Sequence, residues 1–578
     1  MDDTESNVLR QAIFALGETG GQDSLLLSLL NVPRFASFRK EILESLGQSR
    51  NDVTVSNLAD LLTTLPDSLK ATTIRAMSFI ASKKFNNRQI NLRLRTFLAD
   101  SLPDVRAAAA YFFSRHPYSG AIHSLIRSRM EVASVAEKYR LKAISLSLED
   151  YYIQRTDSAL FDTLRQQIVS DLKKNTIPWQ QKFYELSVLR HFDDAESNRL
   201  IKDFLSDTNP HLRKSAIQAL SYSDSLDVKQ ALLKVYADAS WLDKGEIVLA
   251  LSAKYPRITY PLIQRNLDKG SQHFKQLLLK SLAVIRSRMA VNQLKQFLLV
   301  PDTRLKYTAF SELVELREIG YRDAAVLLES ADLALTTVAA GWIAEHPHLA
   351  RFEDLKNAYA RFSEPDGVEA MQAIIEAMAG EGSSQSAGFL KTICDTSSSP
   401  VLVNSAKSGY SRITSKPLPH RQIAFNLFVP DTMYFSEPVA QAILITSRGE
   451  VTFSLHPEIA AATVSNFIYL AKKGFYNNLS FHRVVSDFVV QGGDPRGDGW
   501  GGPGYAIPCE YTSTPFKRGT VGMATAGKDT GGSQFFICHS EQPHLNGRYT
   551  VFAEVVSGMD IVDLLDIDDK ILKIIIQN

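Results

Sequence analysis

Cysteine is scarce in this chain. Only Cys394, Cys509 and Cys538 occur among 578 residues. Thiols that lie so far apart make neither a disulfide framework nor a metal site, so no metal is expected. Cys538 ends the apolar run 534–538, and it is therefore predicted to pack in the core as a small hydrophobic residue.

The chain also lacks an excess of either charge. Lys and Arg together number 64 and Asp and Glu 63, which leaves a formal net charge of +1. This balance argues against nucleic acid as a partner. Hydrophobic residues make up 45% and charged residues 22%, as in ordinary globular proteins. A chain of 578 residues exceeds what one core usually supports, so two or more domains are expected.

Long apolar runs are missing as well. No stretch of 18 or more apolar residues is present, so no transmembrane segment is expected. The first residues, Met1–Glu5, are acidic and have neither the positive start nor the apolar stretch of a signal peptide. The sequence as written predicts a cytoplasmic protein. It would be exported, to the periplasm or cell envelope, if an N-terminal signal has been removed.

Residues 1–415 follow the pattern of one helix after another. Apolar residues at helical spacing between Val8 and Leu16 end at Gly17, where a helix C-cap belongs. Similar segments return at intervals of roughly 30–40 residues, several with proline in the first turn. They lie at 38–47, 103–110, 210–220 and 301–305.

This recurrence is typical of an α-solenoid, and it resembles HEAT repeats, in which each unit is a helical hairpin. The resemblance implies a long exposed surface for a peptide or another protein, so an unknown protein partner is expected on residues 1–415. The Pro-Asp-x-Arg element is missing from several expected positions, for example near Ile74–Met77. A helical bundle without repeats therefore remains the alternative.

The pattern changes after residue 415. Several prolines would interrupt any long helix, and the residues between them are too apolar for a free tether, so 416–435 are predicted to form a packed connector. Residues 436–578 hold 16 of the 30 glycines, which indicates tight turns and a β domain. Helices are expected at 460–473 and 558–565. Strands are expected at 440–446, 451–455, 481–491, 520–524, 533–538, 550–555 and 570–576, which together favour a closed barrel.

Three motifs lie in order within this last region. The first combines Phe481-His482-Arg483-Val484-Val485 with Phe488-Val489-Val490-Gln491-Gly492-Gly493-Asp494; the second combines 519–524 with 531–537; the third spans 545–552. Together they resemble a cyclophilin, a peptidyl-prolyl cis-trans isomerase. The resemblance is confined to residues 436–578. It implies an eight-stranded antiparallel β-barrel capped by two helices, which works without a cofactor.

The residue types suit this chemistry. Resonance gives the peptide C–N bond a rotation barrier of roughly 18–20 kcal/mol. In the twisted state this resonance is lost and the prolyl nitrogen gains a free lone pair, so a donor aimed at that nitrogen helps only there. Arg is always charged and presents several donors in a rigid fork. We therefore assign Arg483 as the catalyst, with Gln491 holding the guanidinium or binding the substrate backbone.

The family's matching positions also suggest how substrate is bound. Backbone groups near Thr525 and the amide of Gln534 would anchor the flanking peptide. His544 stands where many members have Trp, which puts strong cyclosporin binding in doubt, and Tyr549 stands where His is frequent but can still pack on the ring and donate through its hydroxyl. The walls of an apolar, water-poor proline pocket would be Phe488, Val489, Phe536 and Leu545.

The same residues also allow less specific interpretations. Arg483 could form a structural ion pair with Asp487 or Glu510. The glycine-rich segment 497–502 could suggest a phosphate cradle, but no Lys-Ser or Lys-Thr follows, so a loop beside the active site is favoured. No nucleophile and base stand side by side in the motifs, which leaves a hydrolase without support.

Two functions follow. The first is an active prolyl isomerase acting on X-Pro bonds of peptides or protein clients, with the helical repeats as a protein-binding scaffold. The alternative is a non-catalytic protein, in which the barrel reads proline peptides or serves as a chaperone module on a scaffold.

Overall fold

A computed structural model describes residues 3–19, 21–49, 51–82, 85–128, 130–149, 158–364, 367–419 and 441–577. Most of the predicted connector, residues 420–435, lies outside these ranges. Within them, no helix is both long enough and apolar enough to cross a membrane. The predicted domain boundaries at 415 and 436 stay predictions.

The chain forms two compact units. The first comprises residues 1–231, 511–518 and 540–548, and the second comprises 232–510, 519–539 and 549–578. The helix α14 (Leu226–Asp238) spans the border between them.

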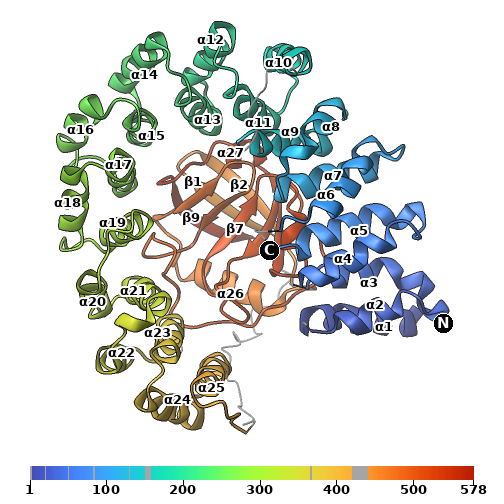
Figure 1. Cartoon of the computed structure of the whole chain (residues 1–578), viewed down its shortest axis with the longest axis vertical. Helices are drawn as coiled ribbons and strands as arrows, with labels where there is room; N and C mark the ends of the chain where they lie inside the picture. The colour runs from blue at the N-terminus through green and yellow to red at the C-terminus, as the bar shows by residue number, and fades with distance from the viewer. Residues whose placement is uncertain are drawn as a thin grey trace. The chain divides into compact units, whose positions relative to one another are not determined.

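Helices make up most of the first unit (Figure 1). Each odd-numbered helix from α1 to α11 packs on the next odd-numbered one, and several even-numbered helices pack beside their neighbours as hairpins. Buried Ala108, Ala109 and Ala110 in α7 let adjacent helices approach closely. The helices are α1 (Asp3–Thr19), α2 (Asp23–Leu29), α3 (Arg39–Leu46), α4 (Asp52–Leu61), α5 (Asp67–Ile80), α6 (Arg88–Thr96), α7 (Pro103–Arg115), α8 (Ile122–Arg127), α9 (Val135–Leu148), α10 (Ser158–Leu172), α11 (Trp179–Leu189), α12 (Ala195–Asp203) and α13 (Pro210–Leu220).

Residues 540–548 contact helices within this first unit. Arg548 donates from Nη2 to the carbonyl of Gly47 at 2.9 Å and from Nε to Oε1 of Gln48 at 2.7 Å. The side chain of Gln48 in turn donates to the carbonyl of Asn546 at 3.1 Å. These bonds hold the segment against the end of α3.

The second unit continues the same helical packing. Consecutive odd-numbered helices from α15 to α25 pack on one another, and each later even-numbered helix pairs with the odd-numbered helix that follows it. Their facing sides share one core that runs from Val248 to Ala406. The helices are α15 (Trp241–Ser252), α16 (Pro256–Gln264), α17 (Gln272–Ile285), α18 (Arg288–Phe297), α19 (Thr303–Glu315), α20 (Tyr321–Leu328), α21 (Leu333–Glu345), α22 (Phe352–Tyr359), α23 (Val368–Glu381), α24 (Ser384–Thr396) and α25 (Pro400–Thr414).

The same unit contains a curled antiparallel sheet. Its strand order is β3-β9-β1-β2-β8-β6-β7-β5-β4. Figure 1 shows the strands together, with α26 beside them. The strands are β1 (Gln441–Thr446), β2 (Gly449–Leu455), β3 (Leu479–Ser480), β4 (Arg483–Val485), β5 (Val489–Gly492), β6 (Thr520–Met523), β7 (Phe535–Cys538), β8 (Val551–Ser557) and β9 (Lys570–Gln577).

Two helices, α26 (Ala461–Lys472) and α27 (Met559–Val562), accompany the sheet as expected. Phe467 of α26 packs its ring against Phe535 of β7, with centroids 5.7 Å apart. Glu510 accepts hydrogen bonds from the backbone N–H groups of Ala462 and Thr463 at 3.0 and 2.8 Å. A carboxylate at a helix N-terminus is favourable because it meets unpaired N–H groups, so Glu510 fixes where α26 begins.

The region expected to form one strand, 481–491, is instead a hairpin. Asp487 has φ of 57°, a left-handed conformation that Asp tolerates better than most residues. The N–H of Phe488 closes the turn by donating to the carbonyl of Val485 at 3.0 Å. The split into β4 and β5, together with the short β3, gives nine strands among the described residues where the family resemblance implied eight.

Candidate active site

A row of paired residues crosses four neighbouring strands. Arg483 of β4 lies opposite Gln491 of β5, which lies opposite Phe536 of β7, which lies opposite Gly522 of β6. Directly opposed residues in antiparallel strands point to the same face of a sheet. The four positions therefore share one face, although they come from three separate parts of the sequence.

The strand alternation places this row outside the sheet's core. Val490, Phe535 and Ile537 belong to the buried core that contains α26. Their sequence neighbours Gln491 and Phe536 must point the other way, since successive side chains alternate between the two faces. The sheet therefore displays an arginine, an amide and an aromatic ring together on its outer face.

Hydrogen bonds join the polar members of the site. The guanidinium of Arg483 donates from Nη1 to Oε1 of Gln491 at 3.3 Å. The amide nitrogen of Gln491 donates to Oε1 of Gln534 at 3.0 Å. Gln491 therefore turns its oxygen towards the arginine because its nitrogen is engaged by the second glutamine.

Apolar rings and a valine surround these groups. The Arg483 Cζ lies 5.5 Å from the ring centroid of Phe488, within cation–π range. Phe536 and Tyr549 meet edge to face, with centroids 5.7 Å apart. Val489 is 2% exposed and Phe536 5% exposed. The arginine thus stands beside a surface that favours an apolar ring.

Glu510, one of the two acids considered as an ion-pair partner of Arg483, is engaged elsewhere. It accepts from α26, as described above, while the guanidinium donates to Gln491 and lies beside the ring of Phe488. Burial lowers the pKa of Arg483 from its usual value, while the neighbouring Tyr549 acts in the opposite direction. The group stays charged because arginine keeps its proton in proteins.

The remaining predicted residues lie in two places. Half-buried Thr525 follows β6, next to Ala524, whose N–H donates to the carbonyl of Gln534 at 2.9 Å. His544 and Leu545 belong to the first compact unit, in the 3₁₀ turn Pro543–Leu545. Burial, with nearby cations, lowers the pKa of His544 to about 3, so it is neutral at physiological pH.

The motifs missed the groups that orient Gln534. Its amide nitrogen donates to the carbonyls of Gly499 and Gly501, at 2.9 and 2.8 Å. The glycine-rich segment 497–502 is therefore a loop beside the site, as the sequence favoured. Backbone carbonyls occur at every residue, so the sequence cannot show which of them accept from Gln534. The run of glycines was the one sequence feature that pointed to this loop.

A further expectation concerns Cys538. Cys538 is fully buried, and burial raises the pKa of its thiol. Among the residues that the structure describes, no cluster of three or more His, Cys, Asp or Glu side chains is placed to hold a metal ion.

The site thus presents an outward-facing arginine, bonded to Gln491, beside the rings of Phe488 and Phe536. Comparison with known proteins identifies the family. Residues 442–573 match the model of the cyclophilin type peptidyl-prolyl cis-trans isomerases. The helices α1–α25 lie outside this span.

Individual relatives match the same part of the chain. Peptidyl-prolyl cis-trans isomerase B of Bacillus subtilis is 55% identical over 119 residues, which span 20% of this chain and 83% of that protein. A peptidyl-prolyl cis-trans isomerase of Helicobacter pylori is 47% identical over 140 residues, 24% of this chain and 86% of its own length. A solved cyclophilin type isomerase of Cryptosporidium parvum is 31% identical and covers 24% of this chain and 98% of its own, with a TM-score of 0.23. The identities to the two bacterial relatives show that the chain belongs to the cyclophilin-type peptidyl-prolyl cis-trans isomerases.

Proposed function

We propose that Arg483 is the group that accelerates isomerisation of X-Pro bonds in peptides and protein clients. The single observation that supports this best is the row Arg483–Gln491–Phe536 on the outer face of the sheet. A proline ring seated on Phe536 brings its nitrogen towards the guanidinium. As the bond twists, a donor of Arg483 meets the lone pair that appears on that nitrogen.

The residues around Arg483 each have a role in this mechanism. Gln491 accepts one N–H of the guanidinium and so limits its rotation. Phe488, Val489 and Tyr549 exclude water, which strengthens the charge–lone-pair interaction. Thr525 is assigned to binding the peptide that flanks the proline. No proton is transferred and no covalent bond is broken.

The energies required are within reach of these groups. A hydrogen bond from a charged donor is worth about 1.5–3 kcal/mol. Each 1.4 kcal/mol gained only in the twisted state gives a factor of about ten in rate. The guanidinium alone would supply about one to two orders of magnitude, and pocket desolvation and peptide anchoring would add the rest.

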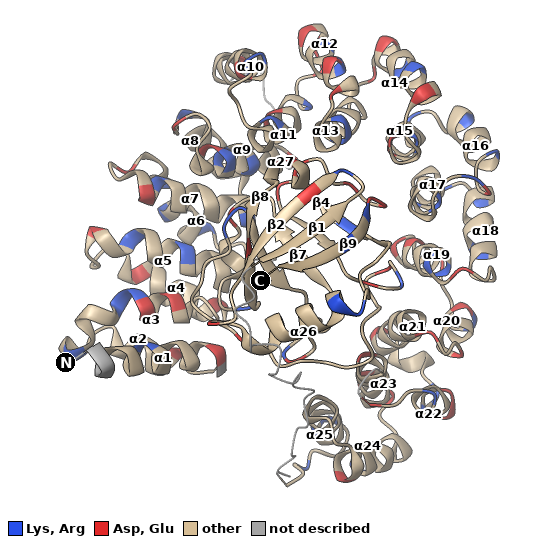
Figure 2. Ribbon diagram, turned by 180° about the vertical axis from the view of Figure 1, so that it is seen from behind, with Lys and Arg blue, Asp and Glu red and all other residues tan. Residues whose placement is uncertain are grey.

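For the helices α1–α25 we propose a HEAT-like α-solenoid that holds a protein client or a larger assembly near the enzyme. The regular packing of odd-numbered helices on one another supports it, because stacked hairpins give this neighbour-only pattern. Lys, Arg, Asp and Glu are spread along these helices, and both signs occur throughout (Figure 2). Such a mixed surface suits a protein partner better than a polyanion.

One experiment tests both parts. The full chain is assayed on a proline tetrapeptide and on a protein whose refolding is limited by one X-Pro bond. Isomerase activity requires faster cis–trans exchange of the tetrapeptide, and a recruiting array requires a lower KM for the protein than for the tetrapeptide. No acceleration of the tetrapeptide would reject the assigned catalysis, and equal KM values would reject recruitment.

A further inference from the structure

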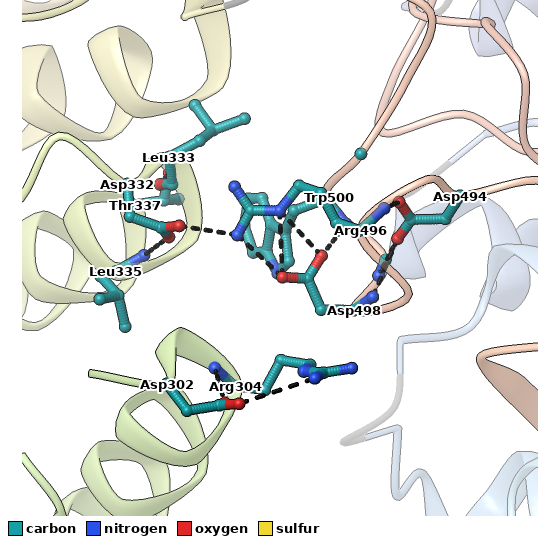
Figure 3. Close-up of polar contacts among 12 residues, drawn as sticks. Asp302, Arg304, Asp332, Leu333, Leu335, Thr337, Asp494, Arg496, Asp498 and Trp500 are labelled. Atoms are coloured by element: carbon teal, nitrogen blue, oxygen red, sulfur yellow. Dashed lines mark hydrogen bonds and ion pairs between the residues drawn. The ribbon is translucent and has the colours of Figure 1, made fainter. Parts of the chain in front are cut away.

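A loop of the sheet region contacts helices of the same compact unit. This loop, residues 494–501, follows β5, and its Arg496 donates from Nη2 to Oδ2 of Asp332 at 2.7 Å (Figure 3). Asp332 is the N-cap of α21. The ring of Trp500 lies 6.4 Å from that of Tyr307 in α19, centroid to centroid. The loop therefore rests on two consecutive odd-numbered helices of the array.

The guanidinium of Arg496 serves both sides of this contact. Besides Asp332 it binds Asp498 within the loop, with Nε 3.2 and 3.1 Å from the two carboxylate oxygens and Nη2 2.8 Å from one of them. The two carboxylates are 13% and 11% exposed. Two largely buried carboxylates bound by one planar guanidinium hold the two segments in a more defined orientation than an exposed ion pair would.

A buried carboxylate ties the parts of this loop together. Asp494 is 1% exposed and accepts the backbone N–H groups of Arg496, Asp498 and Gly499 at 2.7, 3.0 and 2.5 Å. Figure 3 shows these bonds converging on Asp494. Gly501 passes so close that a Cβ there would come within 2.0 Å of Oδ1 of Asp494. The backbones of Arg496 and Gly499 are therefore held by the same carboxylate, and Gly501 packs against it.

Those carbonyls determine which way two glutamines point. The amide nitrogen of Gln534 can only donate, and it faces the carbonyls of Gly499 and Gly501. Its oxygen is then left to accept from the amide nitrogen of Gln491, whose own oxygen accepts from Arg483. If the amide of Gln534 were flipped, its NH₂ group would face the NH₂ group of Gln491. Gln491 could relieve this only by flipping as well, and its oxygen would then point away from Arg483.

We propose that Arg496 and Asp332 are positioning residues for Arg483. Their contact holds the loop on α21, the loop carbonyls orient Gln534, and Gln534 orients Gln491, which aims the guanidinium. This inference rests on the proposed function, since it requires Arg483 to act on the prolyl nitrogen. It gives the helices a role in catalysis that does not depend on any client.

The test uses the full chain and a variant that keeps the helix cap. Asp332→Asn removes the charge that binds Arg496 but retains an oxygen for the N–H of Leu335, which Asp332 accepts at 3.1 Å. The matched control is Asp302→Asn at the N-cap of α19, where the carboxylate accepts from Arg304 and Leu305 of its own helix at 3.0 and 3.1 Å. Figure 3 shows the pairing of Asp302 with Arg304.

We expect Asp332→Asn to lower kcat on a proline tetrapeptide by about two- to thirtyfold, the range typical of substitutions that act through a contact network. KM should change less than twofold, because an interaction made only in the twisted state affects kcat. Asp302→Asn should leave both constants unchanged. Adding Asp332→Asn to Arg496→Gln should cause no further loss, since both break the same contact.

Arg483→Ala, measured in parallel, separates the two proposals. If Arg483→Ala is slow but Asp332→Asn keeps kcat within twofold of the wild type, positioning is rejected and the assigned catalyst stands. If Arg483→Ala keeps the wild-type rate, both proposals are rejected. Losses that multiply in the double variant, or an equal loss in Asp302→Asn, would also overturn positioning.

Discussion

Removing the guanidinium of Arg483 is the most informative perturbation of the site. Arg483→Ala deletes the proposed donor to the prolyl nitrogen and leaves Phe536 and Val489, which form the adjacent apolar surface, in place. Arg483 is only partly buried, and its hydrogen bond to Gln491 is long at 3.3 Å. We therefore expect the free energy of unfolding to change by less than about 0.5 kcal/mol.

The expected effect on rate follows from the type of bond that is lost. A hydrogen bond to a charged donor contributes about 1.5–3 kcal/mol. If that contribution exists only in the twisted state, kcat/KM should fall by about 10- to 150-fold. Arg483→Lys keeps a charge but loses the planar fork, so its activity should lie between those of the wild type and the alanine variant.

The assay is the cis–trans relaxation of a proline tetrapeptide after a solvent jump, with thermal unfolding measured on the same samples. Arg448→Ala is the matched control. Arg448 is also an exposed arginine of the sheet region, but it lies in the β1–β2 turn and pairs with Asp569 at 2.9 Å. Wild-type kcat/KM in Arg483→Ala, or an equal loss in Arg448→Ala, would refute the assigned role.

Three further predictions concern Gln534, His544 and Cys538. Gln534→Glu places an acceptor against the carbonyls of Gly499 and Gly501, so the free energy of unfolding should fall by about 1–3 kcal/mol and kcat should decrease. An unchanged denaturant midpoint and an unchanged kcat would contradict this. Burial lowers the pKa of His544 from 6.5 to about 3 in the folded chain, so as the pH falls the unfolded chain is protonated at this residue before the folded chain is. The stability that is fully present above pH 6.5 is therefore lost as the pH falls towards 3. The thermal midpoint should decline over that range, and less steeply in His544→Gln. Burial of Cys538 raises the pKa of its thiol, so a thiol reagent should label it only after unfolding; rapid labelling of the native chain would contradict the packing.

The sequence predicted the parts of the fold that local patterns encode. The hairpin of β1 and β2, helix α26 and strands β6 to β9 lie close to their expected positions, because apolar alternation and glycine turns mark them. The division of 481–491 into two strands was missed, since it depends on the left-handed conformation of one non-glycine residue, Asp487.

The site was predicted less completely than the strands that carry it. The motifs supplied Arg483, Gln491 and Gln534, which hydrogen bonds now link in that order. They could not supply the contact of Arg496 with Asp332, because these residues are 164 positions apart and belong to no shared motif. Tertiary contacts between separately patterned regions leave no periodic signal in a single sequence.

Exchange NMR on a proline tetrapeptide with catalytic amounts of the full chain tests the central claim most directly. Exchange cross-peaks between the cis and trans forms should be present with the wild type and lost or strongly reduced with Arg483→Ala. Shifted peptide resonances without exchange would show that the chain reads proline peptides and does not isomerise them, and would contradict the account.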